Sequence, residues 1–169
     1  MDNAFHCIGL IGKFGEAEVS ATVLDLARIL RKRGCEVLLE QQTAENIFNP
    51  GLPTATIGGL AEQCDLVITV GGDGTLLSTA RQMVDHDVPL LGVNLGRLGF
   101  LVDVPPVNMA ESIGAILDGQ FQEERRLMLT TRIVHHAGGE DSVGDALNDV
   151  VVHKWEVARM IETETWING

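Results

Sequence analysis

The stretch LVITVGGDGT, residues 66–75, decides the fold that this sequence predicts. It begins with a run of apolar and β-branched residues, and a short run of this kind bounded by glycines predicts a buried strand. The turn that follows holds one acid among three glycines. Gly71 and Gly72 leave room for a phosphate against the backbone, and the N–H groups that open a following helix add an anion site. The stretch therefore predicts a strand that leads into a phosphate-binding turn.

Strands and helices alternate on both sides of this stretch. Further strands are predicted at residues 5–11, 36–39 and 88–93, and helices at 16–32, 75–84 and 109–117. Residues 41–53 predict a loop or a short irregular helix, and 58–63 a helical turn. Strand, helix, strand in this order indicates βαβ units. The predicted fold class is α/β, a Rossmann-like open parallel sheet with flanking helices, in a first domain at residues 1–120.

Two smaller patterns refine this domain. Gly9, Gly12 and Gly15 do not have the GxGxxG spacing of a dinucleotide fingerprint, so they predict a plain strand-to-helix turn. Asn108 and Glu111 have the spacing of a capping box at the start of the helix at 109–117.

Helical periodicity is absent after residue 120. Strands are predicted at 127–135, 147–153 and 158–167, so residues 121–169 read as the opening of an antiparallel β domain. The final dipeptide, Asn168–Gly169, is a strong hairpin signal, yet no partner strand follows it. We therefore expect the chain to be a fragment whose all-β second domain is truncated.

Composition excludes several classes of partner. The net charge of −12 and an aromatic content of 4% argue against binding to nucleic acid or to an anionic membrane surface. The amino terminus lacks a basic region followed by a long apolar stretch, so no signal peptide is predicted, and a cytoplasmic location is expected. Cysteines and histidines are predicted to be structural or surface residues and not metal ligands; they are Cys7, Cys35, Cys64, His135, His136 and His153.

Asp73 is the unusual residue of the turn, because its charge would repel a phosphate. The carboxylate makes sense if it accepts a proton from an attacking hydroxyl or orients that hydroxyl. It could also hold a metal ion together with the phosphates. The structural alternative is that Asp73 only shapes the turn or caps the following helix. No lysine follows the glycines, so the turn is not a Walker P-loop.

Three motifs together resemble the NAD kinases. GGDGT at residues 71–75 resembles the signature of these enzymes and of the related diacylglycerol and sphingosine kinases, and phosphofructokinases carry a similar turn. NLGRLGFL at 94–101 and the Asn148–Asp149 pair in ALNDVVVHK resemble two further NAD kinase motifs, in the same order and spacing. The lipid kinases share only the first motif.

The resemblance implies a kinase that phosphorylates the 2′-hydroxyl of the adenosine ribose of NAD to give NADP. It implies ATP or inorganic polyphosphate as donor, Mg²⁺ or another divalent cation without a dedicated protein cluster, and a homo-oligomer in the full-length protein. Asp73 matches the catalytic proton acceptor. The phosphate-binding residues implied are Gly71, Gly72, Gly74 and Thr75. The NAD-binding residues implied are Asp73, Gly74, Phe100, Asn148, Asp149 and Arg159, the last falling at a basic NAD-contacting position.

Other interpretations stay open on sequence alone. Asn148–Asp149 could be a turn, Arg159 a solvated strand residue and Phe100 a core residue. The chain could belong to a lipid or sugar kinase that shares GGDGT, or to a noncatalytic nucleotide-binding module. Because phosphoryl transfer depends mostly on positioning, and later nucleotide contacts of the second domain are absent, we expect this fragment to be inactive or nearly so.

Overall fold

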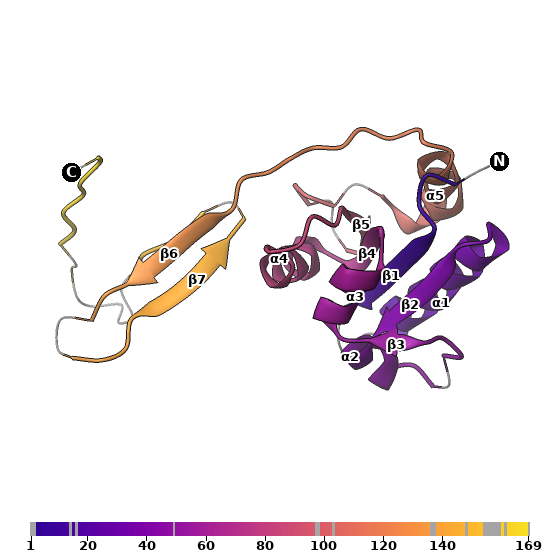
Figure 1. Cartoon of the computed structure of the whole chain (residues 1–169), viewed down its shortest axis with the longest axis horizontal. Helices are drawn as coiled ribbons and strands as arrows, with labels where there is room; N and C mark the ends of the chain where they lie inside the picture. The colour runs from indigo at the N-terminus through magenta and orange to yellow at the C-terminus, as the bar shows by residue number, and fades with distance from the viewer. Residues whose placement is uncertain are drawn as a thin grey trace.

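The computed structural model describes residues 3–13, 15, 17–48, 50–96, 99–102, 104–135, 138–147, 149–153, 160 and 162–168. Its main unit is a five-stranded parallel sheet in the order β3-β2-β1-β4-β5 (Figure 1). The strands are β1 (Cys7–Gly12), β2 (Glu36–Glu40), β3 (Thr54–Ala55), β4 (Leu66–Gly71) and β5 (Leu90–Asn94). The predicted parallel sheet is confirmed.

Helices cover both faces of this sheet (Figure 1). They are α1 (Ala17–Lys32), α2 (Gln41–Glu45), α3 (Ile57–Gln63), α4 (Asp73–Gln82) and α5 (Met109–Leu117), which follows a 3-10 turn, η1 (Pro106–Asn108). α1 and α5 pack on one face, where Leu10 and Ile68 join their apolar side chains in one core. α3 packs on the other face with Ile11 and Val67. Because both faces are covered, every residue of β4 is buried.

The order of the strands creates a crevice beside β4. β1 pairs with β2 on one side and with β4 on the other, so the strand order reverses direction between β1 and β4. Helices that follow these two strands therefore lie on opposite faces, and their starting segments separate at the carboxyl edge of the sheet. In open α/β sheets this is where ligands bind.

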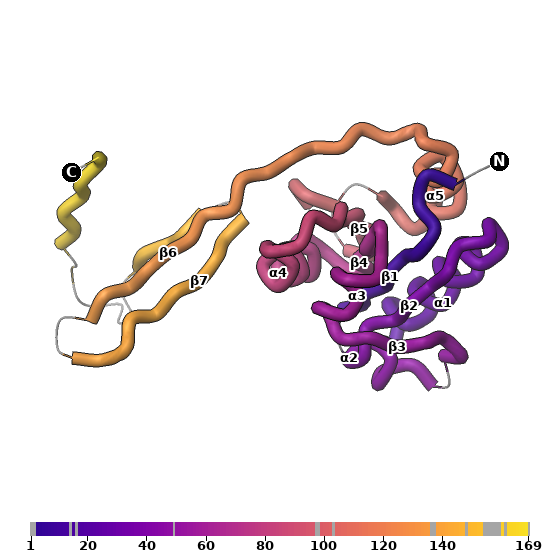
Figure 2. Tube along the Cα trace, in the orientation of Figure 1, coloured from indigo at the N-terminus to yellow at the C-terminus, as the bar shows by residue number. Residues whose placement is uncertain are grey.

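A two-stranded antiparallel sheet follows the parallel one. Residues 121–128 have no regular structure and lead from α5 to β6 (Leu129–Ile133), which pairs with β7 (Ser142–Ala146). The tube in Figure 2 shows this segment passing over the α/β unit to the hairpin, and β7 contacts α4. The proposed division between residues 120 and 121 stays a prediction.

Three predictions about local structure are wrong. The predicted strand at 147–153 is absent from the described residues there, because the ladder ends where Leu129 pairs with Ala146. In the predicted strand at 158–167, Met160 and residues 162–167 form no ladder; residues 158, 159 and 161 lie outside the described residues. Asn108 makes no capping hydrogen bond, because η1 holds it at φ −109°, ψ 11° instead of the extended conformation of a cap.

Candidate active site

The GGDGT turn joins β4 to α4 at the carboxyl edge of the sheet. Gly71 ends β4, Gly72 is the extended N-cap, and α4 begins at Asp73. The helix starts two residues before the predicted position, because the Gly72 carbonyl already accepts from the N–H of Thr75 at 3.0 Å. A side chain at Gly71 would not fit: its Cβ would lie 2.5 Å from Thr75 Oγ1 and 3.2 Å from Lys13 Cβ. The glycine therefore lets the ends of β1 and β4 approach each other.

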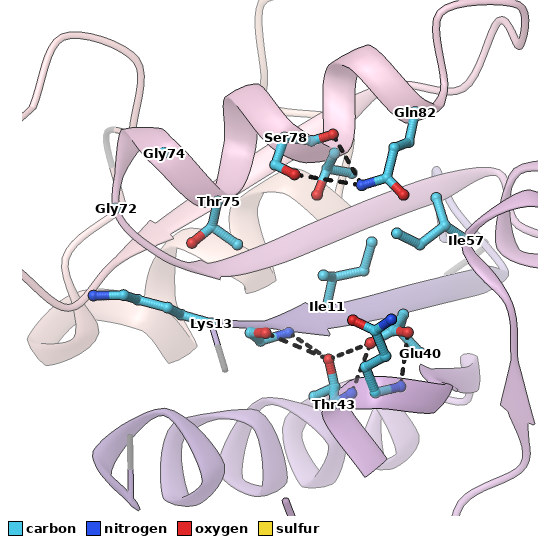
Figure 3. A pocket seen from close by; sticks show the side chains of 13 residues that line it. Ile11, Lys13, Glu40, Thr43, Ile57, Gly72, Gly74, Thr75, Ser78 and Gln82 are labelled. Carbon is cyan, nitrogen blue, oxygen red and sulfur yellow. Dashed lines mark hydrogen bonds between the residues drawn. The ribbon is translucent and has the colours of Figure 1, made fainter. Parts of the chain in front are cut away.

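A cleft of about 410 Å³ lies between the turn and the ends of β1 and β2 (Figure 3). One wall is a single face of α4, at the helical spacing i, i+3, i+4 and i+7. The opposite wall comes from the end of β1 and from the junction of β2 with α2. The lining residues are Ile11, Gly12, Lys13, Glu40, Gln42, Thr43, Ile57, Gly72, Gly74, Thr75, Ser78, Thr79 and Gln82.

The end of this cleft nearest the turn suits an anion. Gly72 and Gly74 bring the backbone of the first turn of α4 to the surface of the cleft, and Thr75 adds a hydroxyl. The first N–H groups of a helix have no partner within the helix, and Gly72 has no side chain to cap them. Lys13 is the only lysine or arginine among the described residues that line the cleft. Three of the four predicted phosphate-binding residues therefore line this cleft. The fourth, Gly71, does not line it, but its lack of a side chain leaves room for Thr75 and Lys13, which do.

The Asp73 carboxylate lies outside this cleft lining and binds a second loop. Its Oδ2 accepts from the backbone N–H of Phe100 at 2.8 Å, and its Oδ1 accepts from the N–H of Leu101 at 3.2 Å. Asp73 therefore does not cap α4, which removes one of the two structural alternatives considered for it. Because a carboxylate oxygen accepts up to two hydrogen bonds, each oxygen retains capacity for a further donor.

Gly99 makes this contact possible. A Cβ at position 99 would lie 2.6 Å from Asp73 Cγ and 2.6 Å from Asp73 Oδ2. Real Cβ atoms essentially never approach so closely. The two glycine-bearing loops that follow β4 and β5 thus meet through one carboxylate, and the second loop fixes its orientation.

The predicted NAD-binding residues divide into three groups. Phe100 sits beside the acid through its backbone, while its side chain is 95% exposed, so the alternative of a core phenylalanine is wrong. Asp149 is exposed and lines a separate hollow of about 300 Å³ on the β6–β7 hairpin. Asn148 and Arg159 lie outside the described residues.

Sequence reasoning missed Lys13, Glu40 and Thr43. Lys13 follows β1, one of the two strands between which the strand order reverses, and this position was an available signal for it. Glu40 ends β2, the strand next to β1, and Thr43 lies in the helix that follows. The spacing of Glu40 and Thr43 is a second signal, since Glu40 is the N-cap of α2 and accepts from the Thr43 N–H at 2.6 Å.

The described residues hold no cluster of three or more His, Cys, Asp or Glu that could bind a metal ion. Cys7, Cys35 and Cys64 are free thiols, and the first and last are in contact, with 3.8 Å between their sulfurs. Burial raises the pKa of Cys64 to about 12, with smaller contributions from Cys7 and nearby acids. Within the part of the chain that is described, no helix is long and apolar enough to cross a membrane.

Comparison of this sequence with known protein families identifies the family to which it belongs. The ATP-NAD kinase N-terminal domain matches residues 8–121, more than half of the chain. The chain belongs to the NAD kinase family. This confirms the resemblance drawn from GGDGT, NLGRLGFL and Asn148–Asp149.

Relatives within the NAD kinase family align along almost the whole chain. The NAD kinase of Chromohalobacter salexigens is 46% identical over 165 residues, covering 98% of this chain and 56% of that protein. The NAD kinase of Pseudomonas putida strain W619 is 45% identical over 167 residues, covering 98% and 55%. The chain thus spans about half the length of these curated relatives. Yeast NADH kinase complexed with NADH shares the fold, with a TM-score of 0.69 at 20% identity over 85% of this chain and 47% of that one.

Proposed function

We propose that this NAD kinase chain is the amino-terminal part of an enzyme that transfers a phosphoryl group to the 2′-hydroxyl of the adenosine ribose of NAD, giving NADP. The donor in this proposal is ATP or inorganic polyphosphate, and Asp73 accepts the proton of the hydroxyl. Membership of the family supports the reaction. The two-sided arrangement of the GGDGT turn supports the assignment of roles within it.

The observation that carries the proposal is that the residues of one turn face two different regions. Gly72, Gly74 and Thr75 line the cleft, whereas the Asp73 carboxylate contacts the loop that contains Phe100. A phosphoryl transfer needs this geometry, because the donor phosphate and the acceptor hydroxyl must approach from different directions and meet in line. The turn lies between these two regions.

On the donor side, the cleft offers charge and placed donors. Backbone N–H groups at the start of α4 and the Lys13 ammonium complement the charge of a polyphosphate. A divalent cation fits as a partner of the donor's phosphates, since Mg²⁺ keeps waters and phosphate oxygens as most of its ligands and needs few from protein. Such an ion would neutralise charge on the transferred group.

On the acceptor side, Asp73 is held ready to receive a hydroxyl. Hydrogen bonds from the N–H groups of Phe100 and Leu101 restrict its rotation, so its remaining lone pairs keep fixed directions. NAD would bind against this side through Gly74, the exposed ring of Phe100, and the predicted contacts of Asn148, Asp149 and Arg159. The exposed Asp149 carboxylate suits ribose hydroxyls, which donate to carboxylates.

Replacing Asp73 by asparagine in the whole enzyme tests the proposal. We expect kcat for NADP formation to fall by a factor of about 10² to 10⁴, the usual contribution of a general base, while the dissociation constant for NAD changes little. NADP formation is followed with a coupled dehydrogenase, and NAD binding by calorimetry. The matched control is Asp87→Asn, because Asp87 is exposed in the segment between α4 and β5, at the opposite edge of the sheet. A variant with kcat within a few-fold of wild type would show that Asp73 is not the base.

Assays with other acceptors, run beside the NADP assay, separate this proposal from its alternatives. Turnover of a diacylglycerol or a hexose phosphate without NADP formation would favour a lipid or sugar kinase, and binding without turnover would favour a noncatalytic module. A homo-oligomeric state and a cytoplasmic location belong to the same proposal and are predictions of it.

A further inference from the structure

Three groups in the cleft wall opposite α4 form a continuous chain of hydrogen bonds (Figure 3). The backbone N–H of Gly12 donates to Thr43 Oγ1 at 2.9 Å, and Thr43 Oγ1 lies 2.8 Å from Glu40 Oε2. Glu40 is 5% exposed, and its carboxylate also accepts from the N–H groups of Gln42 at 2.7 Å and Thr43 at 2.6 Å. The chain therefore runs from the end of β1, through a hydroxyl, to a buried carboxylate that caps α2.

The chemistry of these groups sets the direction of each bond. A carboxylate only accepts, so the single hydroxyl proton of Thr43 goes to Glu40 and not to the Gly12 carbonyl, which is 3.4 Å away. The lone pairs of Thr43 Oγ1 are then left to accept the Gly12 N–H. Because Glu40 is charged, its bond from the Thr43 hydroxyl is stronger than a bond between neutral groups, and it polarises the hydroxyl that accepts from Gly12.

These hydrogen bonds also restrict the backbone at Lys13. Gly12 is held by Thr43 on one side, and the next N–H, that of Lys13, donates to the Val70 carbonyl at 2.9 Å on the other side. The backbone that carries the Lys13 side chain is thus fixed both to α2 and to the end of β4. The Lys13 Cβ also packs close to Gly71, at the foot of the GGDGT turn.

We propose that Thr43 is a positioning residue for the phosphoryl donor: its hydroxyl fixes the Gly12–Lys13 backbone so that Lys13 faces the phosphate-binding end of the cleft. Thr43 acts through Gly12 and Lys13, and Glu40 holds its hydroxyl in the required orientation. This inference rests on the proposed function, because it takes the cleft as the donor side of the turn.

Thr43→Val in the whole enzyme removes the hydroxyl and preserves the branched shape. The Gly12 N–H and the Glu40 carboxylate each lose a partner, so the loop is expected to shift and donor affinity to fall by about tenfold, which corresponds to one hydrogen bond. Both the KM for the donor and the dissociation constants for a non-hydrolysable ATP analogue and for inorganic tripolyphosphate are measured. The KM for NAD should stay within about twofold of the wild-type value, because the acceptor side is untouched.

Thr43→Ser is the rescue variant, since it restores the hydroxyl, and it should recover donor affinity to within about twofold. Glu40→Gln is a second route to the same defect, because an amide has one acceptor oxygen and cannot replace both carboxylate oxygens, which accept from Gln42 and from Thr43. Circular dichroism and thermal unfolding establish that each variant is folded. If Thr43→Val does not fold, the donor affinities of Glu40→Gln and Thr43→Ser still test the positioning role of Thr43.

The outcomes separate the inference from the proposed function. A wild-type enzyme that binds the ATP analogue or tripolyphosphate but forms no NADP contradicts the proposed function, and the loss of probe binding in Thr43→Val still supports the positioning role. Unchanged donor affinity in Thr43→Val or Glu40→Gln overturns the inference, as does an equal loss of NAD and donor affinity. Failure of the wild type to bind either probe overturns it as well.

Discussion

Substituting alanine for Gly99 tests whether the position of the Asp73 carboxylate controls the reaction. The φ angle of Gly99 lies outside the left-handed region, so the backbone itself accepts alanine. The added Cβ would lie 2.6 Å from Asp73 Cγ, whereas ordinary contacts begin at 3.4 Å. Either the carboxylate or the loop around residue 99 must therefore move.

The size of the effect follows from this overlap. Relieving it requires a movement of about 1 Å, and a misplacement of this size at a reacting group costs about 100-fold in rate, or about 2.7 kcal/mol of activation free energy. The movement also weakens the hydrogen bonds from Phe100 and Leu101 to Asp73, because both donors lie in the displaced loop. We expect kcat for NADP formation to fall by about 100-fold. The donor KM should change little, because the cleft does not include this loop.

The assay is steady-state NADP formation by the whole enzyme at saturating NAD and donor. Gly96→Ala is the matched control, because it lies in the same loop and its Cβ would meet only Asn94 Oδ1, at an ordinary 3.7 Å. This control should keep its kcat within about twofold of wild type, and unfolding curves of both variants exclude a general loss of structure. A Gly99→Ala enzyme that is as fast as Gly96→Ala would refute the role of the second loop in orienting Asp73.

Three further predictions concern stability and thiol chemistry. Leu10→Ala, at a fully buried position of β1, should lower the unfolding free energy in urea by about 2–5 kcal/mol, whereas Val107→Ala, at a position 87% exposed, should lower it by less than about 0.5 kcal/mol. The folded protein should protect Cys64 from a thiol reagent at pH 8, because burial raises its pKa from 9.0 to about 12 and keeps the thiol protonated. The stability linked to this pKa shift is present below pH 9 and is lost as the pH rises through about 12. Cys64→Ala should therefore show a smaller decline in unfolding free energy between these pH values than the wild type. An equally steep decline in the variant would contradict the assignment.

Local sequence patterns predicted the parallel sheet well because they record burial directly. The run at 66–70 is apolar except for the β-branched Thr69 and does not alternate, as expected for a strand covered on both faces, and it forms the start of β4. The apolar spacing in residues 16–32 likewise predicted α1, with Gly34 ending it at φ +83°. These features depend on neighbours within a few positions, so one segment of sequence contains the information.

Features that depend on residues far apart in the sequence could not be predicted from local patterns. A strand exists only where another strand pairs with it, which is why the β-rich pattern at 147–153 did not show that the ladder ends at Ala146. The Thr43 hydroxyl accepts a hydrogen bond from Gly12, 31 positions earlier, and the Asp73 carboxylate accepts one from Phe100, 27 positions later. No short-range pattern records such pairs.

The exact start of α4 explains how an acid can occur in a turn that we propose to bind phosphate. Successive residues of an α-helix are separated by about 100° around its axis, so residues two positions apart point about 200° apart. With α4 beginning at Asp73, the side chains of Asp73 and Thr75 must leave the helix on opposite sides, and the intervening Gly74 obstructs neither. Thr75 accordingly lines the cleft, while Asp73 reaches the loop at residues 99–101. A helix that started at Thr75 would have left Asp73 in an irregular turn with no defined side. The carboxylate therefore does not lie against the cleft wall where we propose that the phosphate binds: the GGDGT sequence turns the acid about half a helical turn away from that wall while keeping both at one end of one helix.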